Sequence, residues 1–136
     1  MRVLGIDHVA MLHGELDAAA KPVLELLGMS LGAREFVDSQ KTEAAFLLTA
    51  DEAGACVELI APKGGNPGLE KFLEKRGPGL HHVAFLVDDL AAALLELDQK
   101  GVPLIDKQPR PGARGHKVGF LHPRAFGGIL VELVGH

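Results

Sequence analysis

Several features that would place a protein in a particular class are missing from the sequence. It has one cysteine, Cys56, so no disulfide can form within the chain, which fits a reducing compartment. It has no apolar run of about 18 residues, which a membrane-spanning helix needs. It has no charged leader followed by an apolar segment and a cleavage site. These absences predict a soluble, cytoplasmic protein.

Positive charge is also in short supply. The formal net charge is −4, which argues against general affinity for nucleic acid or anionic membranes. One segment departs from this pattern, because residues 107–124 contain no Asp or Glu and carry five cationic side chains: Lys107, Arg110, Arg114, Lys117 and Arg124. Two interpretations stay open, a solvated basic loop and a binding site for an anionic small molecule.

What the sequence does contain is a repeat. GIDHVAMLHGEL at 5–16 resembles GLHHVAFLVDDL at 79–90, and a constant offset of 74 positions aligns them. The same offset pairs Phe46 with Phe120 and the segment VEL at 57–59 with VEL at 131–133. The chain is therefore predicted to consist of two copies of one structural unit.

Each copy has the hydrophobic pattern of a strand, a helix and three further strands. The first copy predicts strands at 5–12, 29–37, 43–50 and 55–61 and a helix at 15–27. The second predicts strands at 79–87, 102–106, 116–122 and 128–134 and a helix at 89–100. A Gly- and Pro-rich linker with a short helical piece at 69–76 joins them. At 136 residues the length suits one domain, with modules at about 1–62 and 79–136 and a linker at about 63–78.

Two polar residues interrupt an apolar strand face at equivalent places in each copy. They are His8 and Glu58 in the first copy and His82 and Glu132 in the second. A single buried His or Glu is most often an ordinary core residue. Four at matched positions can converge if the copies pack about a pseudo-twofold axis, and buried carboxylates need compensating charge. Two imidazoles and two carboxylates suit a divalent ion, Zn²⁺, Co²⁺, Ni²⁺, Mn²⁺ or Fe²⁺.

At these residues the chain resembles the glyoxalase and vicinal-oxygen-chelate superfamily. Within it, four stretches are similar to the methylmalonyl-CoA epimerase family: IDHVA at 6–10, VELIAP at 57–62, FLEKRGPGLHHVAF at 72–85 and PRPGARGHKVGFLHPRAFGGILVEL at 109–133. The resemblance implies an α+β fold in which two tandem βαβββ modules form a cupped mixed sheet.

The resemblance also implies a metal-dependent epimerisation of methylmalonyl-CoA. Its metal ligands fall on His8, Glu58, His82 and Glu132, with Co²⁺ as the expected ion. The reaction removes the C2 proton through a metal-stabilised enolate and returns it on the opposite face, which is simplest with two acid/base groups. Glu132 is the candidate for one of them.

The second acid/base group departs from the family pattern. Ala44 stands where some epimerases have Glu, and the adjacent Glu43 faces away unless a one-residue bulge turns it. Glu43 is the candidate for the second acid/base group, and water, His122 or another group are the alternatives. For His122 a turn-capping role is favoured. His81 is expected to be structural. Cys56 is either a small buried apolar residue or a fifth ligand.

Under the epimerase interpretation, the basic segment acquires a ligand, because coenzyme A carries phosphates. Arg114, Lys117 and Arg124 are the predicted contacts. The resemblance leaves two other functions open, a glyoxalase I acting on a glutathione hemithioacetal and a metal-free small-molecule-binding module. The predicted partners are a coenzyme A thioester substrate and a second copy of the chain in a homodimer, with no nucleic acid or membrane.

Overall fold

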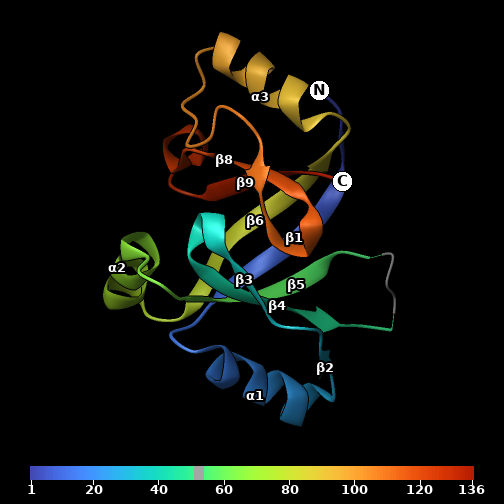
Figure 1. Ribbon diagram of the computed structural model, residues 1–136, viewed down its shortest axis with the longest axis vertical. Coiled ribbons are helices and arrows are strands. Elements are labelled where there is room, and N and C mark those ends of the chain that lie inside the picture. The colour runs from blue at the N-terminus through green and yellow to red at the C-terminus, as the bar shows by residue number, and fades with distance from the viewer. Residues whose placement is uncertain (51–53) are drawn as a thin grey trace. The chain divides into compact units, whose positions relative to one another are not determined.

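The computed structural model describes residues 1–50 and 54–136, which divide into two compact units (Figure 1). One unit combines Met1–Asp7 with His82–His136, and the other is His8–His81. The strand β1 (Val3–Leu12) therefore contributes its first half to one unit and its second half to the other. Within the described ranges, no helix has the length and hydropathy to cross a membrane.

The His8–His81 unit is a mixed sheet covered by a helix. Its strands run in the order β2-β4-β5-β1, and β3 also pairs with β4. The bounds are α1 (Leu16–Leu27), β2 (Ser30–Leu31), β3 (Glu35–Val37), β4 (Thr42–Leu48), β5 (Cys56–Pro62) and α2 (Pro67–Arg76). The pair β1–β5 is parallel and β4–β5 antiparallel. The core of this unit joins Leu16 and Ala20 of α1 to the sheet residues Ala45, Leu47, Leu59 and Ala61.

The unit that contains His82–His136 repeats this plan. Its strands follow the order β6-β9-β8-β7, with β6–β9 parallel and β8–β9 antiparallel. The bounds are β6 (Gly79–Val87), α3 (Leu90–Gln99), β7 (Arg110–Pro111), β8 (Lys117–Leu121) and β9 (Leu130–Gly135). The strand β6 begins at Gly79, three residues before the His82–His136 segment of this unit. Leu90, Ala93 and Leu94 of α3 pack on Leu121, Val131 and Leu133.

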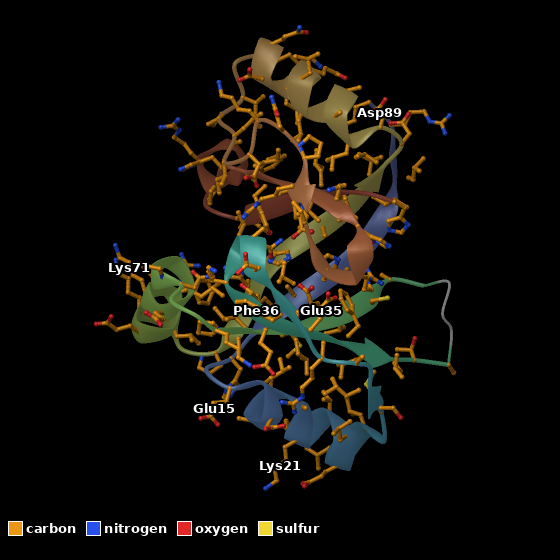
Figure 2. The ribbon with its side chains drawn as sticks, viewed as in Figure 1. Glu15, Lys21, Glu35, Phe36, Lys71 and Asp89 are labelled. Atoms are coloured by element: carbon orange, nitrogen blue, oxygen red, sulfur yellow. The ribbon has the colours of Figure 1, made fainter. Side chains whose placement is uncertain are left out.

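Local sequence sets the ends of the helices. Asp89 is the N-cap of α3 and accepts a hydrogen bond from the Ala92 N–H at 3.0 Å, and Figure 2 shows it at the start of that helix. Asn66 caps α2 in the same way, with Pro67 following it in the first turn. Gly28 ends α1 in the left-handed region at φ 64°, where glycine carries no steric penalty.

The strand predicted at 29–37 is broken in the structure. Both β2 and β3 pair with β4, with Leu31 opposite Leu47 and Glu35 opposite Ala44. Three residues on one side therefore face two on the other, which is a one-residue bulge at 32–34. Gly32 lies in the bulge, and a Cβ there would approach the Phe46 carbonyl oxygen to 3.2 Å. The bulge lies in the partner of β4, while β4 pairs with β5 in unbroken register.

A second expectation needs correction. The strand predicted at 102–106 is reduced to one isolated bridge, between Leu104 and Leu121, and the strand β7 lies later, at Arg110–Pro111. Asp106 explains part of this difference. Its carboxylate accepts hydrogen bonds from the Phe120 N–H at 2.9 Å and the Arg110 Nε at 3.1 Å, so a side chain takes a donor of β8 that a strand would otherwise use.

Candidate metal-binding residues

The first His–Glu pair lies within the His8–His81 unit. His8 on β1 and Glu58 on β5 are buried, and the His8 Nε2 is 3.6 Å from the Glu58 Oε1. Alternate β5 residues, Leu59 and Ala61, pack toward α1, so Glu58 occupies the sheet face away from that helix. Phe46, opposite Glu58 in the β4–β5 register, meets the His8 ring edge-on at 5.6 Å.

The second pair repeats this geometry within the other unit. The His82 Nε2 is 3.1 Å from the Glu132 Oε2, and both side chains are buried. Glu132 lies between Val131 and Leu133, which pack toward α3, so it too faces away from its helix. Phe120 is opposite Glu132 and meets the His82 ring edge-on at 5.3 Å. The spacing of 74 residues thus corresponds to a spatial motif of three side chains in each unit.

Each pair suits a divalent ion in its donor chemistry. Zinc binds imidazole nitrogen and carboxylate oxygen at roughly 2.0–2.2 Å, which places two neighbouring ligand atoms on one ion about 3 to 3.5 Å apart. The separations of 3.1 and 3.6 Å lie close to this range. All four side chains are between 3 and 8% exposed, and a buried carboxylate needs a compensating charge. The residues present therefore fit a divalent metal.

The placement of Glu43 does not support its predicted catalytic role. The unbroken β4–β5 register puts Glu43 opposite Ala61, on the face where Ala45 and Leu47 pack toward α1. Its carboxylate lies 3.4 Å from the Arg34 Nη1 and 3.7 Å from the Lys63 Nζ. Turning Glu43 to the face of Glu58 would require a bulge in β4. The β4–β5 register contains none, and the one-residue bulge lies between β2 and β3 instead.

Ala44 does lie on the same face as Phe46 and Glu58, as predicted from alternation. It is fully buried at 1% exposure. That position therefore carries a methyl group and no titratable side chain.

Two further residues, His122 and His81, have the local environments that the sequence suggests, whereas Cys56 is less buried than expected. His122 is exposed, and its Nδ1 accepts a hydrogen bond from the Arg124 N–H at 3.0 Å, which confirms the turn-capping role. The His81 ring packs against the Phe72 ring at 5.3 Å, away from the face that His82 occupies. Cys56 is half-buried and pairs in register with His8.

The basic segment is partly neutralised by acidic residues elsewhere in the sequence. Lys107 pairs with Asp98 at 3.1 Å, and the Arg114 Nη2 lies 2.8 Å from the Asp7 Oδ2. Lys117 and Arg124 are exposed, and no carboxylate of residues 1–50 or 54–136 forms an ion pair with them. The local sequence gave no sign of the Asp7 contact, because the two residues are 107 positions apart.

Asp7 is the residue that sequence reasoning missed. Its side chain is 5% exposed, and its Oδ1 lies 2.7 Å from the Nε2 of His136. The available signal was its position beside His8, at which the second copy has His81. This difference between the two copies was visible, but nothing nearby in the sequence indicated a partner.

Comparison with known proteins places this fold and these residues in a family. Residues 7–120 match the family model described as the glyoxalase/bleomycin resistance protein/dioxygenase superfamily, and the chain belongs to that superfamily. It is 34% identical over 130 residues to a protein of Cereibacter sphaeroides named ethylmalonyl-CoA/methylmalonyl-CoA epimerase, covering 94% of this chain and 95% of that one.

Two solved structures are similar over nearly the whole chain. The crystal structure of methylmalonyl-CoA epimerase from Mycobacterium tuberculosis has a TM-score of 0.89 and 38% identity, covering 98% of this chain and 88% of that one. A methylmalonyl-CoA epimerase in complex with methylmalonyl-CoA and NH4+ has a TM-score of 0.88 and 31% identity, covering 98% and 95%. The superfamily resemblance and the α+β fold class predicted from the sequence are thereby confirmed.

Proposed function

We propose that this protein is a divalent-metal-dependent epimerase of methylmalonyl-CoA. The observation that carries the proposal is the duplicated triad of His, Glu and Phe, since an enzyme of this class needs buried cation ligands. Similarity to proteins named methylmalonyl-CoA epimerase supports the choice of substrate.

The proposed metal ligands are His8, Glu58, His82 and Glu132, which together hold one ion. Within each unit the His Nε2 and the carboxylate oxygen are already close, at 3.6 and 3.1 Å. Neutral imidazoles leave the charge of the two carboxylates to balance a divalent cation. Co²⁺ is the proposed ion, and Zn²⁺, Ni²⁺, Mn²⁺ and Fe²⁺ suit the same donors.

The reaction exchanges the proton at C2, which lies between a thioester carbonyl and a carboxylate. A divalent ion held by His8, Glu58, His82 and Glu132 would supply positive charge where negative charge develops as the C2 proton leaves. We assign Glu132 as one acid/base group: its carboxylate takes the proton from one face of the substrate. A second group must return a proton to the other face, and this group stays unassigned.

Phe46 and Phe120 have a positioning role in this proposal. Each ring contacts the imidazole of its unit edge-on, at interplanar angles of 88° and 89°. Such contacts stabilise aromatic pairs by about 0.5–1.5 kcal/mol beyond the burial of area. The rings hold His8 and His82 in one orientation and keep water away from their outer edges.

Lys117 and Arg124 are the proposed contacts for the phosphates of coenzyme A. Both are exposed cations within the basic segment. Arg114 is a weaker candidate for a phosphate contact than the sequence alone suggests, because its guanidinium already donates a hydrogen bond to the Asp7 carboxylate. A Lys117→Ala/Arg124→Ala variant should raise KM for the thioester several-fold with little change in kcat, since phosphate contacts are equal in the ground and transition states.

We also propose that the protein forms a homodimer, to be tested by sedimentation equilibrium.

The first test is deuterium incorporation at C2 of methylmalonyl-CoA in D2O. We expect fast exchange with Co²⁺-loaded protein, loss of exchange after EDTA treatment, and at least a 100-fold decrease for Glu132→Ala, as for removal of a positioned acid/base group. Glu74→Gln, which alters an exposed carboxylate on α2, is the matched control. No exchange with fully loaded protein would overturn the epimerase proposal, and the glutathione hemithioacetal would be the next substrate to test.

The role of Glu43 can be decided in the same assay. Its contacts with Arg34 and Lys63 predict that Glu43→Gln retains exchange. A loss comparable to that of Glu132→Ala would instead restore Glu43 as the second acid/base group.

A further inference from the structure

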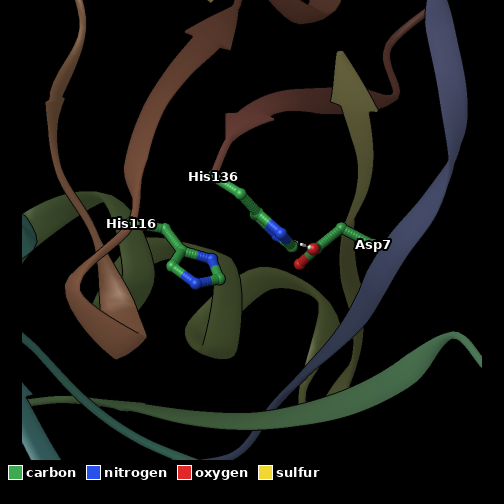
Figure 3. Close-up of side chains that lie close together, drawn as sticks. All are labelled: Asp7, His116 and His136. Atoms are coloured by element: carbon green, nitrogen blue, oxygen red, sulfur yellow. Dashed lines mark hydrogen bonds and ion pairs between the residues drawn. The ribbon is translucent and has the colours of Figure 1, made fainter. Parts of the chain in front are cut away.

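A second cluster of potential metal ligands lies within the unit that contains His82–His136. It consists of Asp7, His116 and His136, whose ligand atoms all lie within 4.8 Å of one another. Figure 3 shows their side chains converging from three separate segments. None of these residues belongs to the His–Glu pairs described above.

The strand pairing explains why the two histidines meet. In the β8–β9 ladder Lys117 is opposite Gly135, so the next positions outward are His116 and His136. Their ring centroids are 3.9 Å apart. Two further hydrogen bonds fix the backbone at His116, one from the Gly112 N–H to the His116 carbonyl oxygen at 2.9 Å and one from the His116 N–H to the Ala113 carbonyl oxygen at 3.1 Å.

Asp7 brings the anionic ligand. Its Oδ1 is 2.7 Å from the His136 Nε2, while its Oδ2 accepts a hydrogen bond from Arg114 at 2.8 Å. Arg114 therefore orients the carboxylate through the oxygen that faces away from the imidazole, as partners of ligating carboxylates do in metal sites. Arg114 has φ 57°, in the left-handed region that non-glycine residues seldom adopt. Residues with strained backbone angles cluster at active sites and ligand-binding sites.

We propose that Asp7, His116 and His136 form a second divalent-metal site, distinct from the His–Glu pairs. Two imidazoles and one carboxylate match the ligand set of a three-ligand zinc site that leaves a position for water. His136 follows Glu132 by four residues on the same strand face, which is a separation of about 13 Å at roughly 3.3 Å per residue. One ion cannot reach both groups of ligands.

Such an ion would stabilise the unit that holds it. Asp7 is contributed by the Met1–Asp7 segment and the two histidines by the ends of β8 and β9, so the metal would tie the N-terminal strand to the rest of its unit. Metal bound only in the folded state stabilises that state. Because Arg114 already neutralises part of the Asp7 charge, this site should bind Zn²⁺ more weakly than the four-ligand site.

The test counts zinc ions per chain. Protein stripped with EDTA is dialysed against excess Zn²⁺, and bound zinc is measured by atomic absorption. We expect two ions in the unmodified chain, and one fewer in His136→Ala, His116→Ala and Asp7→Asn. His13→Ala, which changes a histidine outside the cluster, should leave the count unchanged.

The His136 variant should fold, because that side chain is 48% exposed and lies at the end of its strand. Asp7→Asn gives an independent check, since the amide keeps hydrogen-bonding capacity with Arg114 and His136 but is a poor zinc ligand. Equal zinc counts in the unmodified chain, His136→Ala and Asp7→Asn would overturn the proposal. If the four-ligand site is the one that fails, the unmodified chain binds a single ion that His136→Ala loses.

Discussion

The contact between Gly119 and Leu94 leads to a prediction about packing in one copy of the repeat. Gly119 lies on β8, and a Cβ there would be 2.7 Å from the Leu94 Cδ1 and 3.0 Å from the Cδ2. Leu94 on α3 is fully buried at 0% exposure and belongs to the core cluster of its unit, so its side chain can shift only against packed neighbours. Overpacking of this kind costs about 1–3 kcal/mol. Alanine restricts the unfolded chain and recovers about 0.4–1 kcal/mol, so Gly119→Ala should lower the free energy of unfolding by about 1 kcal/mol, within a range of roughly 0–2.6 kcal/mol.

The other copy shows how the same position tolerates a side chain. The offset of 74 aligns Gly119 with Ala45 and Leu94 with Ala20. Ala45 and Ala20 belong to one core cluster of the His8–His81 unit. In the first copy the small helix residue Ala20 packs in the same cluster as the strand residue Ala45. In the second copy the larger Leu94 lies against the strand glycine Gly119. Leu94→Ala alone should cost about 2–5 kcal/mol, and adding Gly119→Ala should cost nothing further or recover part of the loss.

Urea unfolding at equilibrium measures these differences, provided the m-value stays constant. Gly79→Ala is the matched control, because nothing lies within 4 Å of a Cβ at that strand position. It should be neutral or slightly stabilising. The reasoning fails if Gly119→Ala is as stable as Gly79→Ala, or if the effects of Gly119→Ala and Leu94→Ala are additive in the double variant.

Three further predictions concern polar contacts. Asp106→Ala should lower the free energy of unfolding by about 1–3 kcal/mol in urea, because the part-buried Phe120 N–H loses its acceptor; an unchanged midpoint would contradict this. Asp89→Ala should cost about 0.5–2 kcal/mol as a lost helix cap, which Asp89→Asn should largely avoid. Lys100 and the N-terminal amine lower the pKa of Glu96 to about 2 from its ordinary 4.5. Its stabilising contribution is therefore complete above pH 4.5 and is lost as pH falls toward 2. The difference in free energy of unfolding between the unmodified chain and Glu96→Gln should shrink as pH falls from 4.5 toward 2. A difference that stays constant over this range would contradict the prediction.

The sequence predicts most of the fold because the repeat and the strand periodicity are local signals. The strand β6 has the predicted bounds, and the helices begin within two residues and end within one residue of the predicted positions. His8 and Glu58 could be found as a pair because the same two residue types recur at a constant spacing in the other copy. A search of either copy alone would have left them as ordinary buried residues.

The rest depends on pairings that the sequence does not encode locally. The bulge at 32–34 lies where two short strands share β4 as a partner, and Gly32 within the predicted strand is a local sign of it that does not specify the pairing. Asp106 and Phe120 meet across 14 residues, and Asp7 and His136 across 129. No periodicity relates such positions, so only the folded chain reveals the contacts that fix them.

The division of β1 between the two units determines the order in which the molecule can be completed during synthesis. Residues 8–81 are contiguous, so that unit has all of its parts as soon as the ribosome has released residue 81. The other unit is discontinuous and needs Met1–Asp7 together with His82–His136, which are translated after residue 81. Residues 1–7 must therefore wait for partners in their own unit until β6, the neighbour of β1 in the sheet, and Asp88, whose N–H donates to the Arg2 carbonyl oxygen at 3.1 Å, have been made. A circular permutant that starts at residue 8 and carries residues 1–7 after His136 would remove this delay.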